Sequence, residues 1–126
     1  MKNLAAYQTG LHDNSTLLFI FSPTPQDRTF QIQMEQIEER RSALLGHDVV
    51  IAEVFENWQG QVGSCSLPPE GCEGLRQQYH VPNGRFRVML VGKDERIKMV
   101  ADSCVSCEEV IMRVENEPVS MSMSPA

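Results

Sequence analysis

The residues of this 126-residue chain best suited to chemistry are its four cysteines. Cys104 and Cys107 form a C-x-x-C pair, the spacing that dithiol oxidoreductases place at a helix N-terminus, where the helix dipole stabilises a thiolate. Adding Cys65 and Cys72 gives the four thiols of an all-cysteine zinc site, but six residues separate these two where two to four are usual. The cysteines therefore admit a redox pair, a zinc site or ordinary thiols.

Two serines compete to cap the helix that begins near the C-x-x-C pair. If Ser103 is the cap, Cys104 lies in the first helical turn, as a dithiol enzyme requires. If Ser106 is the cap, Glu109 completes a capping box and Cys104 lies outside the helix. We favour Ser106, because the Ser-x-x-Glu signal is explicit and the acidic residues that follow Cys107 oppose a thiolate.

A second group of candidate residues is polar or aromatic and lies in predicted connections. At the start of the first predicted helix, backbone N–H groups can hold an anion, or the same residues can form a helix cap beside a solvated arginine. A tryptophan in a long loop can anchor a partner or cover the core. The candidate binding residues are Ser22, Thr24, Asp27, Arg28, Trp58 and Arg85.

The first half of the chain predicts a parallel β-α-β unit. Residues 16–21 are an unbroken apolar run, typical of a strand buried on both faces. Asp27 caps a helix whose apolar positions recur until Gly46 stops it, with Gln33 on a solvated face. Residues 48–55 form a second apolar strand, and the intervening helix makes the two strands parallel.

The second half begins with a long loop. Residues 56–73 show no periodicity, which predicts a functional or mobile connection. A short helix over 75–79 precedes strands 86–91 and 96–101, which a hairpin joins, and a last helix stops before Pro118. We predict one α/β domain over residues 1–118, with the order β-α-β-α-β-β-α and helices flanking a four-stranded mixed sheet of order 2-1-3-4. Residues 119–126 are a predicted disordered tail.

Four segments carry a resemblance to a known family: residues 17–23 with Asp27 and Arg28, residues 48–54, residues 79–86, and residues 91–94 with Ile97 and Lys98. In these segments the chain resembles a thioredoxin-like family of unknown function. That family has stand-alone bacterial members and relatives within vertebrate sushi-repeat and coiled-coil-domain matrix proteins. The resemblance spans residues 7–116 and implies the thioredoxin fold, but none of its motifs is catalytic.

The thioredoxin resemblance also implies where redox chemistry would lie. The reactive dithiol of that fold lies between the first core strand and its helix, here residues 22–28, which contain no cysteine. The cis-proline that faces the dithiol would precede Phe86, where Arg85 stands. Because strands 48–55 and 96–101 end at the same rim of the predicted sheet, we expect all four cysteines to project from that rim.

The net charge and the hydropathy of the chain limit which partners and which cellular location we expect. Seventeen acidic against eleven basic residues give a net charge of -6, which argues against nucleic acid and anionic membranes as partners. Neither a membrane-spanning run nor a secretory signal is found, so we expect a cytoplasmic protein. We predict a non-catalytic module that binds a protein or peptide and needs no cofactor. The open alternatives are a thiol-disulfide oxidoreductase using Cys104 and Cys107, and a zinc-binding variant using all four cysteines.

Overall fold

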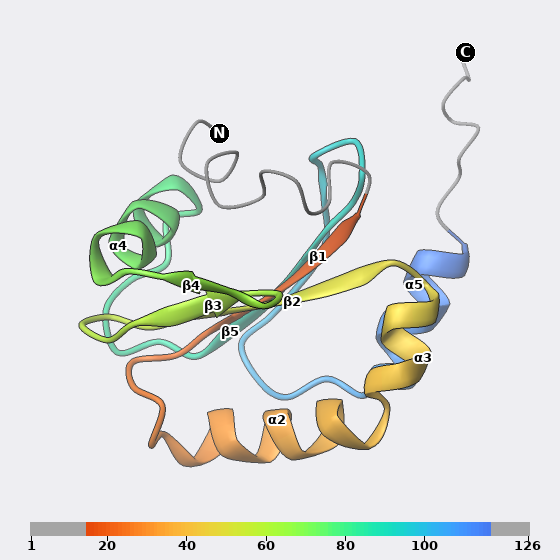
Figure 1. The fold of residues 1–126 in the computed structure, drawn as a ribbon, viewed down its shortest axis with the longest axis horizontal. Coiled ribbons are helices and arrows are strands. Elements are labelled where there is room, and N and C mark those ends of the chain that lie inside the picture. Colours follow the sequence, from red (N-terminus) through yellow and green to blue (C-terminus); the bar gives the residue numbers. More distant parts are fainter. Residues whose placement is uncertain (1–14, 117–126) are drawn as a thin grey trace.

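A computed structural model describes residues 15–116, which form one mixed sheet flanked by helices (Figure 1). The sheet has six strands in the order β4-β3-β2-β1-β5-β6. Strands β1 and β2 are parallel, and every other neighbouring pair is antiparallel. The strands are β1 (Thr16–Phe21), β2 (Val49–Val54), β3 (Gly60–Val62), β4 (Cys65–Leu67), β5 (Arg87–Val91) and β6 (Ile97–Ala101).

The four predicted strands have the predicted order, because β2-β1-β5-β6 is the arrangement 2-1-3-4. The predicted number of strands is wrong, since β3 and β4 extend the sheet beyond β2. Each added strand has three residues, too few to show the alternation that predicts a strand. Gly63 connects them with a φ of +60°, a conformation that glycine adopts without strain.

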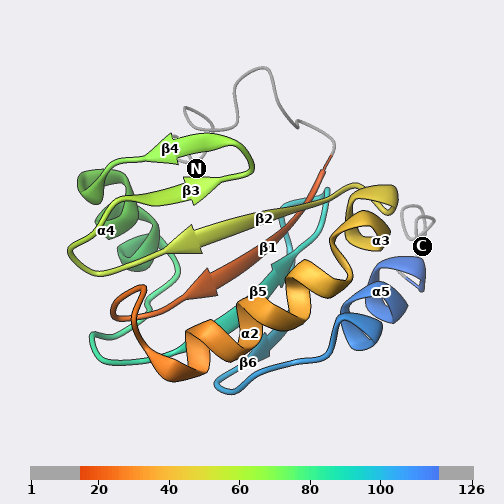
Figure 2. The ribbon, with the colours of Figure 1, turned by 60° about the horizontal axis from the view of Figure 1, so that its bottom comes forward.

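Helices cover the two faces of the sheet unequally (Figure 2). One face packs against α2 (Arg28–Glu39), α3 (Arg41–Gly46) and α5 (Cys107–Glu115), and the other against α4 (Pro69–Gln78). Successive side chains of β1 point to opposite faces, so Phe19 and Phe21 enter the core beneath α4, whereas Leu18 and Ile20 enter the core beneath α2. The whole of β1 is buried, as its apolar run predicts.

Two helix predictions differ from the structure and a third is confirmed. The single helix predicted to end at Gly46 is two helices, because the chain leaves the helical conformation at Arg40. Helix α4 begins at Pro69, six residues before the predicted start, with a proline in its first turn. The Ser106 cap of α5 is confirmed, since its hydroxyl accepts the N–H of Glu109.

Two sequence predictions concern residues outside 15–116. The tail of residues 119–126 lies outside the described residues, and the assignment of residues 1–118 to one domain stays a prediction. No helix within residues 15–116 combines the length and apolar character that crossing a membrane requires.

Candidate functional site

One end of the sheet gathers most of the predicted binding residues, and we call it the rim. Strand pairing defines the rim, because Phe21 at the end of β1 is paired with Val54 at the end of β2 and with Arg87 at the start of β5. The segments that follow β1 and β2 therefore lie beside the segment that precedes β5. They comprise residues 22–28, 55–59 and 82–86.

The β1–α2 connection is the place where a thioredoxin-like dithiol would lie. Ser22 is buried and its hydroxyl donates to the carbonyl of Thr24 at 2.9 Å. The Thr24 hydroxyl accepts the N–H of Gln26 at 3.1 Å. Asp27 caps α2 by accepting the N–H of Phe30 at 3.3 Å. These hydrogen bonds form a turn and a helix cap, and Arg28 is the one predicted binding residue of this connection that is exposed.

Arg85 and Trp58 also lie at the rim, on separate segments. The Arg85 guanidinium donates to Asp102 at 3.0 Å, and Arg87 donates to the same carboxylate at 2.8 Å. The hydrogen bond from Arg87 lowers the pKa of Asp102, and the charge of Arg85 adds to the effect. The side chain of Trp58 is 45% exposed, so it presents an aromatic surface to solvent.

The four cysteines do not share the rim, and that prediction is wrong. The Cys72 thiol donates to the carbonyl of Trp58 at 3.5 Å, so it reaches the rim from the core beneath α4, whereas Cys104 and Cys107 belong to the core on the opposite face. Cys65 is paired with Val62, whose other neighbour lies within β2, so it sits away from the rim. The prediction fails because the chain after β2 turns back as β3 and carries Cys65 away from the rim, and because the sheet separates Cys72 from Cys104 and Cys107.

The separation of the cysteines removes the predicted ligand set for zinc. All four cysteines are free thiols. Within residues 15–116, no group of three or more histidine, cysteine, aspartate or glutamate side chains is arranged to hold a metal ion. The zinc-binding variant that used Cys65, Cys72, Cys104 and Cys107 is therefore not supported by the positions of these residues.

The two thiols of the C-x-x-C segment point to different turns of α2. The Cys104 thiol donates to the carbonyl of Thr29 at 3.4 Å, and the Cys107 thiol donates to the carbonyl of Gln36 at 3.5 Å. Seven residues of helix separate the two carbonyls, or about 10 Å at 1.5 Å per residue. Burial raises the pKa of both thiols, and the carboxylate of Glu108 raises that of Cys107 further. Both thiols therefore act as packing contacts in this structure.

Gln33 holds the C-x-x-C segment against α2, although we predicted it to be solvated. Its side chain is 1% exposed, and its amide nitrogen donates to the carbonyl of Val105 at 2.9 Å. Its amide oxygen accepts the N–H of Val105 at 2.8 Å. The signal was present in the sequence, because Gln33 lies three residues after Phe30 and four before Ile37, on the apolar stripe of the helix.

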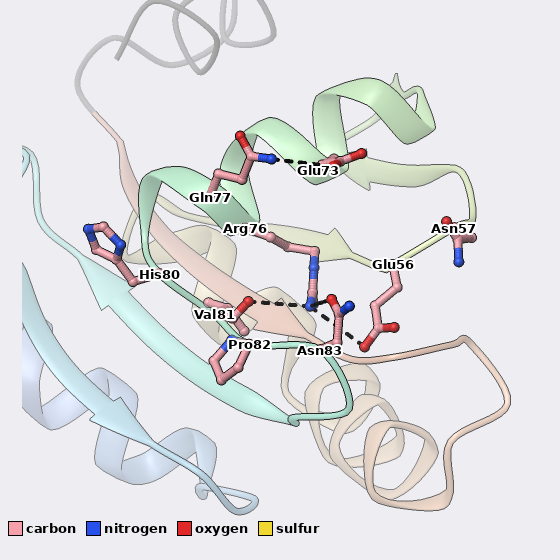
Figure 3. Close-up of a pocket in the computed structure, with 9 residues that line it drawn as sticks. All are labelled: Glu56, Asn57, Glu73, Arg76, Gln77, His80, Val81, Pro82 and Asn83. Atoms are coloured by element: carbon pink, nitrogen blue, oxygen red, sulfur yellow. Dashed lines mark hydrogen bonds and ion pairs between the residues drawn. The ribbon is translucent and has the colours of Figure 1, made fainter.

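A cavity of about 630 Å³ opens at the rim, on the α4 side of the sheet (Figure 3). Three segments line it: the second half of α4, the turn that follows α4, and the residues after β2. None of its residues belongs to the predicted binding set. The lining residues are Glu56, Asn57, Glu73, Arg76, Gln77, His80, Val81, Pro82 and Asn83.

A buried arginine organises this cavity. Arg76 is 5% exposed, and its Nη2 donates to the carbonyl of Val81 at 3.3 Å and to the side-chain oxygen of Asn83 at 2.9 Å. The carboxylate of Glu56 lies 3.6 Å from the same nitrogen and also accepts the N–H of Gly84. Sequence reasoning missed this cluster, because no local pattern shows that an arginine on a polar helix is buried against a glutamate twenty residues earlier.

Comparison with protein families matches residues 10–122 to a family described as a domain of unknown function, DUF4174. The chain belongs to this family. No curated protein matches the chain. The family assignment agrees with the predicted resemblance to a thioredoxin-like family of unknown function, whereas the relationship to vertebrate matrix proteins stays a prediction.

This DUF4174 domain is similar in fold to several solved structures. Mycobacterium tuberculosis AhpC has a TM-score of 0.64 and 11% identity, covering 91% of this chain and 74% of that one. The reduced 2-Cys peroxiredoxin of Plasmodium vivax has a TM-score of 0.66 and 9% identity, covering 87% and 81%. Thioredoxin peroxidase I of Plasmodium yoelii has a TM-score of 0.67 and 10% identity, covering 90% and 78%. The predicted thioredoxin-like fold is confirmed. At identities this low, the similarity supports the fold and nothing further.

Proposed function

We propose that this DUF4174 domain is a non-catalytic thioredoxin-like module that binds a protein or peptide through the rim. The observation that carries the proposal is the β1–α2 connection. Where the fold would place a dithiol, the chain has Ser22, Thr24 and Asp27, and their oxygens make a local turn and a helix cap. The connection therefore has no nucleophile that could attack a disulfide or a peroxide.

The remaining thiols support the same proposal. A thiol nucleophile needs a lowered pKa, because the thiolate is the reactive form. Burial instead raises the pKa of Cys104 and of Cys107, whose hydrogen bonds lead to separate carbonyls of α2. Four free thiols also suit the reducing cytoplasm in which we place the protein.

The rim has the side-chain types that protein interfaces favour. Arginine and tryptophan are enriched among the residues that contribute most to binding, because they combine apolar area with hydrogen-bond donors. Arg28 and Arg85 are exposed, and Trp58 has nearly half of its side chain in solvent. These three side chains come from three segments that meet at the rim. We therefore expect one ligand to contact all of them there.

The competing proposal is a thiol-disulfide oxidoreductase that uses Cys104 and Cys107. One observation favours it: Cys107 is the first residue of α5, at the positive end of the helix dipole. Against it, Cys104 lies before the cap Ser106 and is outside the helix.

Measured thiol reactivity separates the two proposals. Alkylation of each cysteine by iodoacetamide, followed by mass spectrometry across pH, gives the four pKa values, and insulin-reduction and peroxide-consumption assays measure turnover. For a binding module, we expect the pKa values of Cys104 and Cys107 to be at or above the usual value of about 8.5, with no turnover. A pKa below 7 at either thiol, with turnover that Cys107→Ser abolishes, would establish the oxidoreductase instead.

Selection of peptides on the immobilised protein tests the binding half of the proposal. Peptides that bind the rim are expected to lose at least tenfold in affinity when Trp58→Ala or Arg85→Ala is introduced. Leu45→Ala is the matched control, because Leu45 is 60% exposed on α3, away from the rim. If the rim variants leave the affinity of the selected peptides unchanged, or if the selection yields no peptide, the assignment of the rim as the binding surface is overturned.

A further inference from the structure

The cavity organised by Arg76 shares Glu56, Asn57, Pro82 and Asn83 with the rim and extends the binding surface to α4. It is also joined to the β1–α2 connection, because the N–H of Glu56 donates to the carbonyl of Pro23 there at 3.2 Å. The turn on its other side is fixed by two contacts with Arg76. The Val81 N–H donates to the Arg76 carbonyl at 2.9 Å, and the Arg76 side chain donates to the Val81 carbonyl. Its volume lies within the range of small-ligand sites, which are usually largely preformed.

The guanidinium of Arg76 has more donors than the protein has acceptors for them. Three acceptors, from Val81, Asn83 and Glu56, are all directed at Nη2. Nη1 is buried and has no hydrogen-bond partner. Buried polar groups are almost always hydrogen-bonded, so an unpaired donor at a cavity marks a place for an acceptor. A ligand oxygen that reaches Nη1 would supply the acceptor that the protein does not provide.

The charges around the cavity favour an uncharged ligand. Its lining has one guanidinium, on Arg76, and two carboxylates, on Glu56 and Glu73, so its formal charge is -1 with His80 neutral. Glu56 already balances Arg76, and a second carboxylate from an anionic ligand would leave excess negative charge beside a buried pair. A cationic ligand would meet the positive charge of Arg76 where the acceptor is needed.

The other walls complement amide groups. Asn57, Gln77 and Asn83 each carry a carboxamide, which both donates and accepts hydrogen bonds. The Gln77 nitrogen already donates to Glu73 and the Asn83 oxygen already accepts from Arg76, so Gln77 offers a ligand its oxygen and Asn83 its nitrogen. A peptide amide offers the same two functions in a fixed geometry, and its carbonyl is the acceptor that Arg76 lacks. We propose that this cavity binds an uncharged amide, namely a main-chain peptide group of the partner. The inference rests on the proposed function and names the chemistry by which part of the peptide is held.

Nuclear magnetic resonance on the full chain tests this inference with a small amide. Titration of ¹⁵N-labelled protein with N-acetylglycine N-methylamide, an uncharged compound with two amide groups, is expected to give saturable shifts at Asn57, Gln77, Asn83 and Gly84. Acetate and methylammonium at the same concentrations are expected to give smaller shifts at these residues. Larger cavity shifts with either ion would overturn the assignment of an uncharged ligand.

Two glutamine variants provide the matched comparison. Gln77→Ala removes one carboxamide from the cavity wall without touching a contact of Arg76, and is expected to weaken amide binding at least threefold. Gln31→Ala removes an exposed glutamine from α2 and is expected to change nothing. Equal affinity in both variants, or no saturable shift, would refute the cavity as an amide site. Saturable shifts at Trp58 and Arg85 alone would refute it too, while leaving the rim as the peptide-binding surface.

Discussion

Replacement of Gln33 by methionine is expected to lower the free energy of unfolding by about 2–4 kcal/mol. Methionine has a similar length and volume, so the loss of packing is small. The substitution removes two hydrogen bonds to Val105, of 2.9 and 2.8 Å, each worth roughly 1 kcal/mol. Because it leaves the N–H and carbonyl of Val105 facing an apolar side chain, the loss for each bond is set by the cost of an unsatisfied buried group, about 1–3 kcal/mol, which replaces that net value and is not added to it. Val105 is only partly buried, so the lower half of that cost applies.

Equilibrium unfolding in urea measures this loss. With a slope of about 2 kcal/mol per molar urea, typical of small proteins, the midpoint should fall by about 1–2 M. Gln31→Met is the control, because Gln31 is exposed on the same helix, and its effect should stay within about 0.5 kcal/mol. A loss below 1 kcal/mol for Gln33→Met, or an equal loss for the control, would show that the amide does not hold this segment.

Thiol alkylation gives an independent readout of the same substitution. Gln33 binds the backbone between Cys104 and Cys107, so its loss should speed alkylation of these two cysteines under native conditions. Cys72 lies in the core on the opposite face and should gain only as much as global destabilisation predicts. A uniform gain at all three cysteines would contradict a local role for Gln33.

Three further substitutions test other parts of the structure. Ser106→Ala removes the cap of α5 and should cost about 1 kcal/mol in thermal unfolding, whereas Ser103→Ala should cost less than about 0.5; the reverse ranking would refute the assigned cap. Gly60→Ala places a Cβ 2.1 Å from the carbonyl oxygen of Glu53, so it should destabilise by more than about 2 kcal/mol in urea unfolding; a neutral result would refute this close packing. The pKa of His47 is raised, first by the backbone carbonyl at the end of α3 and then by a carboxylate of α5. Its stabilisation is therefore complete below the unfolded value of about 6.5 and is lost as pH rises through the folded pKa. The free energy of unfolding, measured across pH, should show this loss in the natural protein, and His47→Gln should remove it. Identical pH dependence in the two proteins would show that His47 does not couple stability to pH.

The central strands could be predicted because their burial is complete. The six residues of β1 are apolar or nearly so and pack on both faces, so only a central position in the sheet suits them. The Ser106 cap could also be predicted, because a capping box is a local signal of four residues. Features that depend on neighbours in the sequence could therefore be predicted.

Features that depend on residues far apart in the sequence could not be predicted. Strands β3 and β4 contain only three residues each, and they form because they complete the edge of β2, which no window of their own sequence shows. Once the chain turned back there, α4 had to cross to the far face, and Cys72 went with it. The predicted cluster of four thiols therefore does not form, because Cys65 lies on the added strand β4 and the sheet separates Cys72 from Cys104 and Cys107.

The candidate site shows a related limit, because side-chain type and side-chain role diverge in this domain. The cysteines, which are the most reactive side chains by type, make packing contacts, with raised pKa values at Cys72, Cys104 and Cys107. Arg76, a residue of a type that is usually exposed, is buried and shapes a cavity. A buried guanidinium without enough acceptors costs stability, so its presence needs a compensating gain. Binding a ligand that supplies the acceptor is such a gain, and for this reason the cavity at the rim is a stronger functional candidate than the C-x-x-C segment.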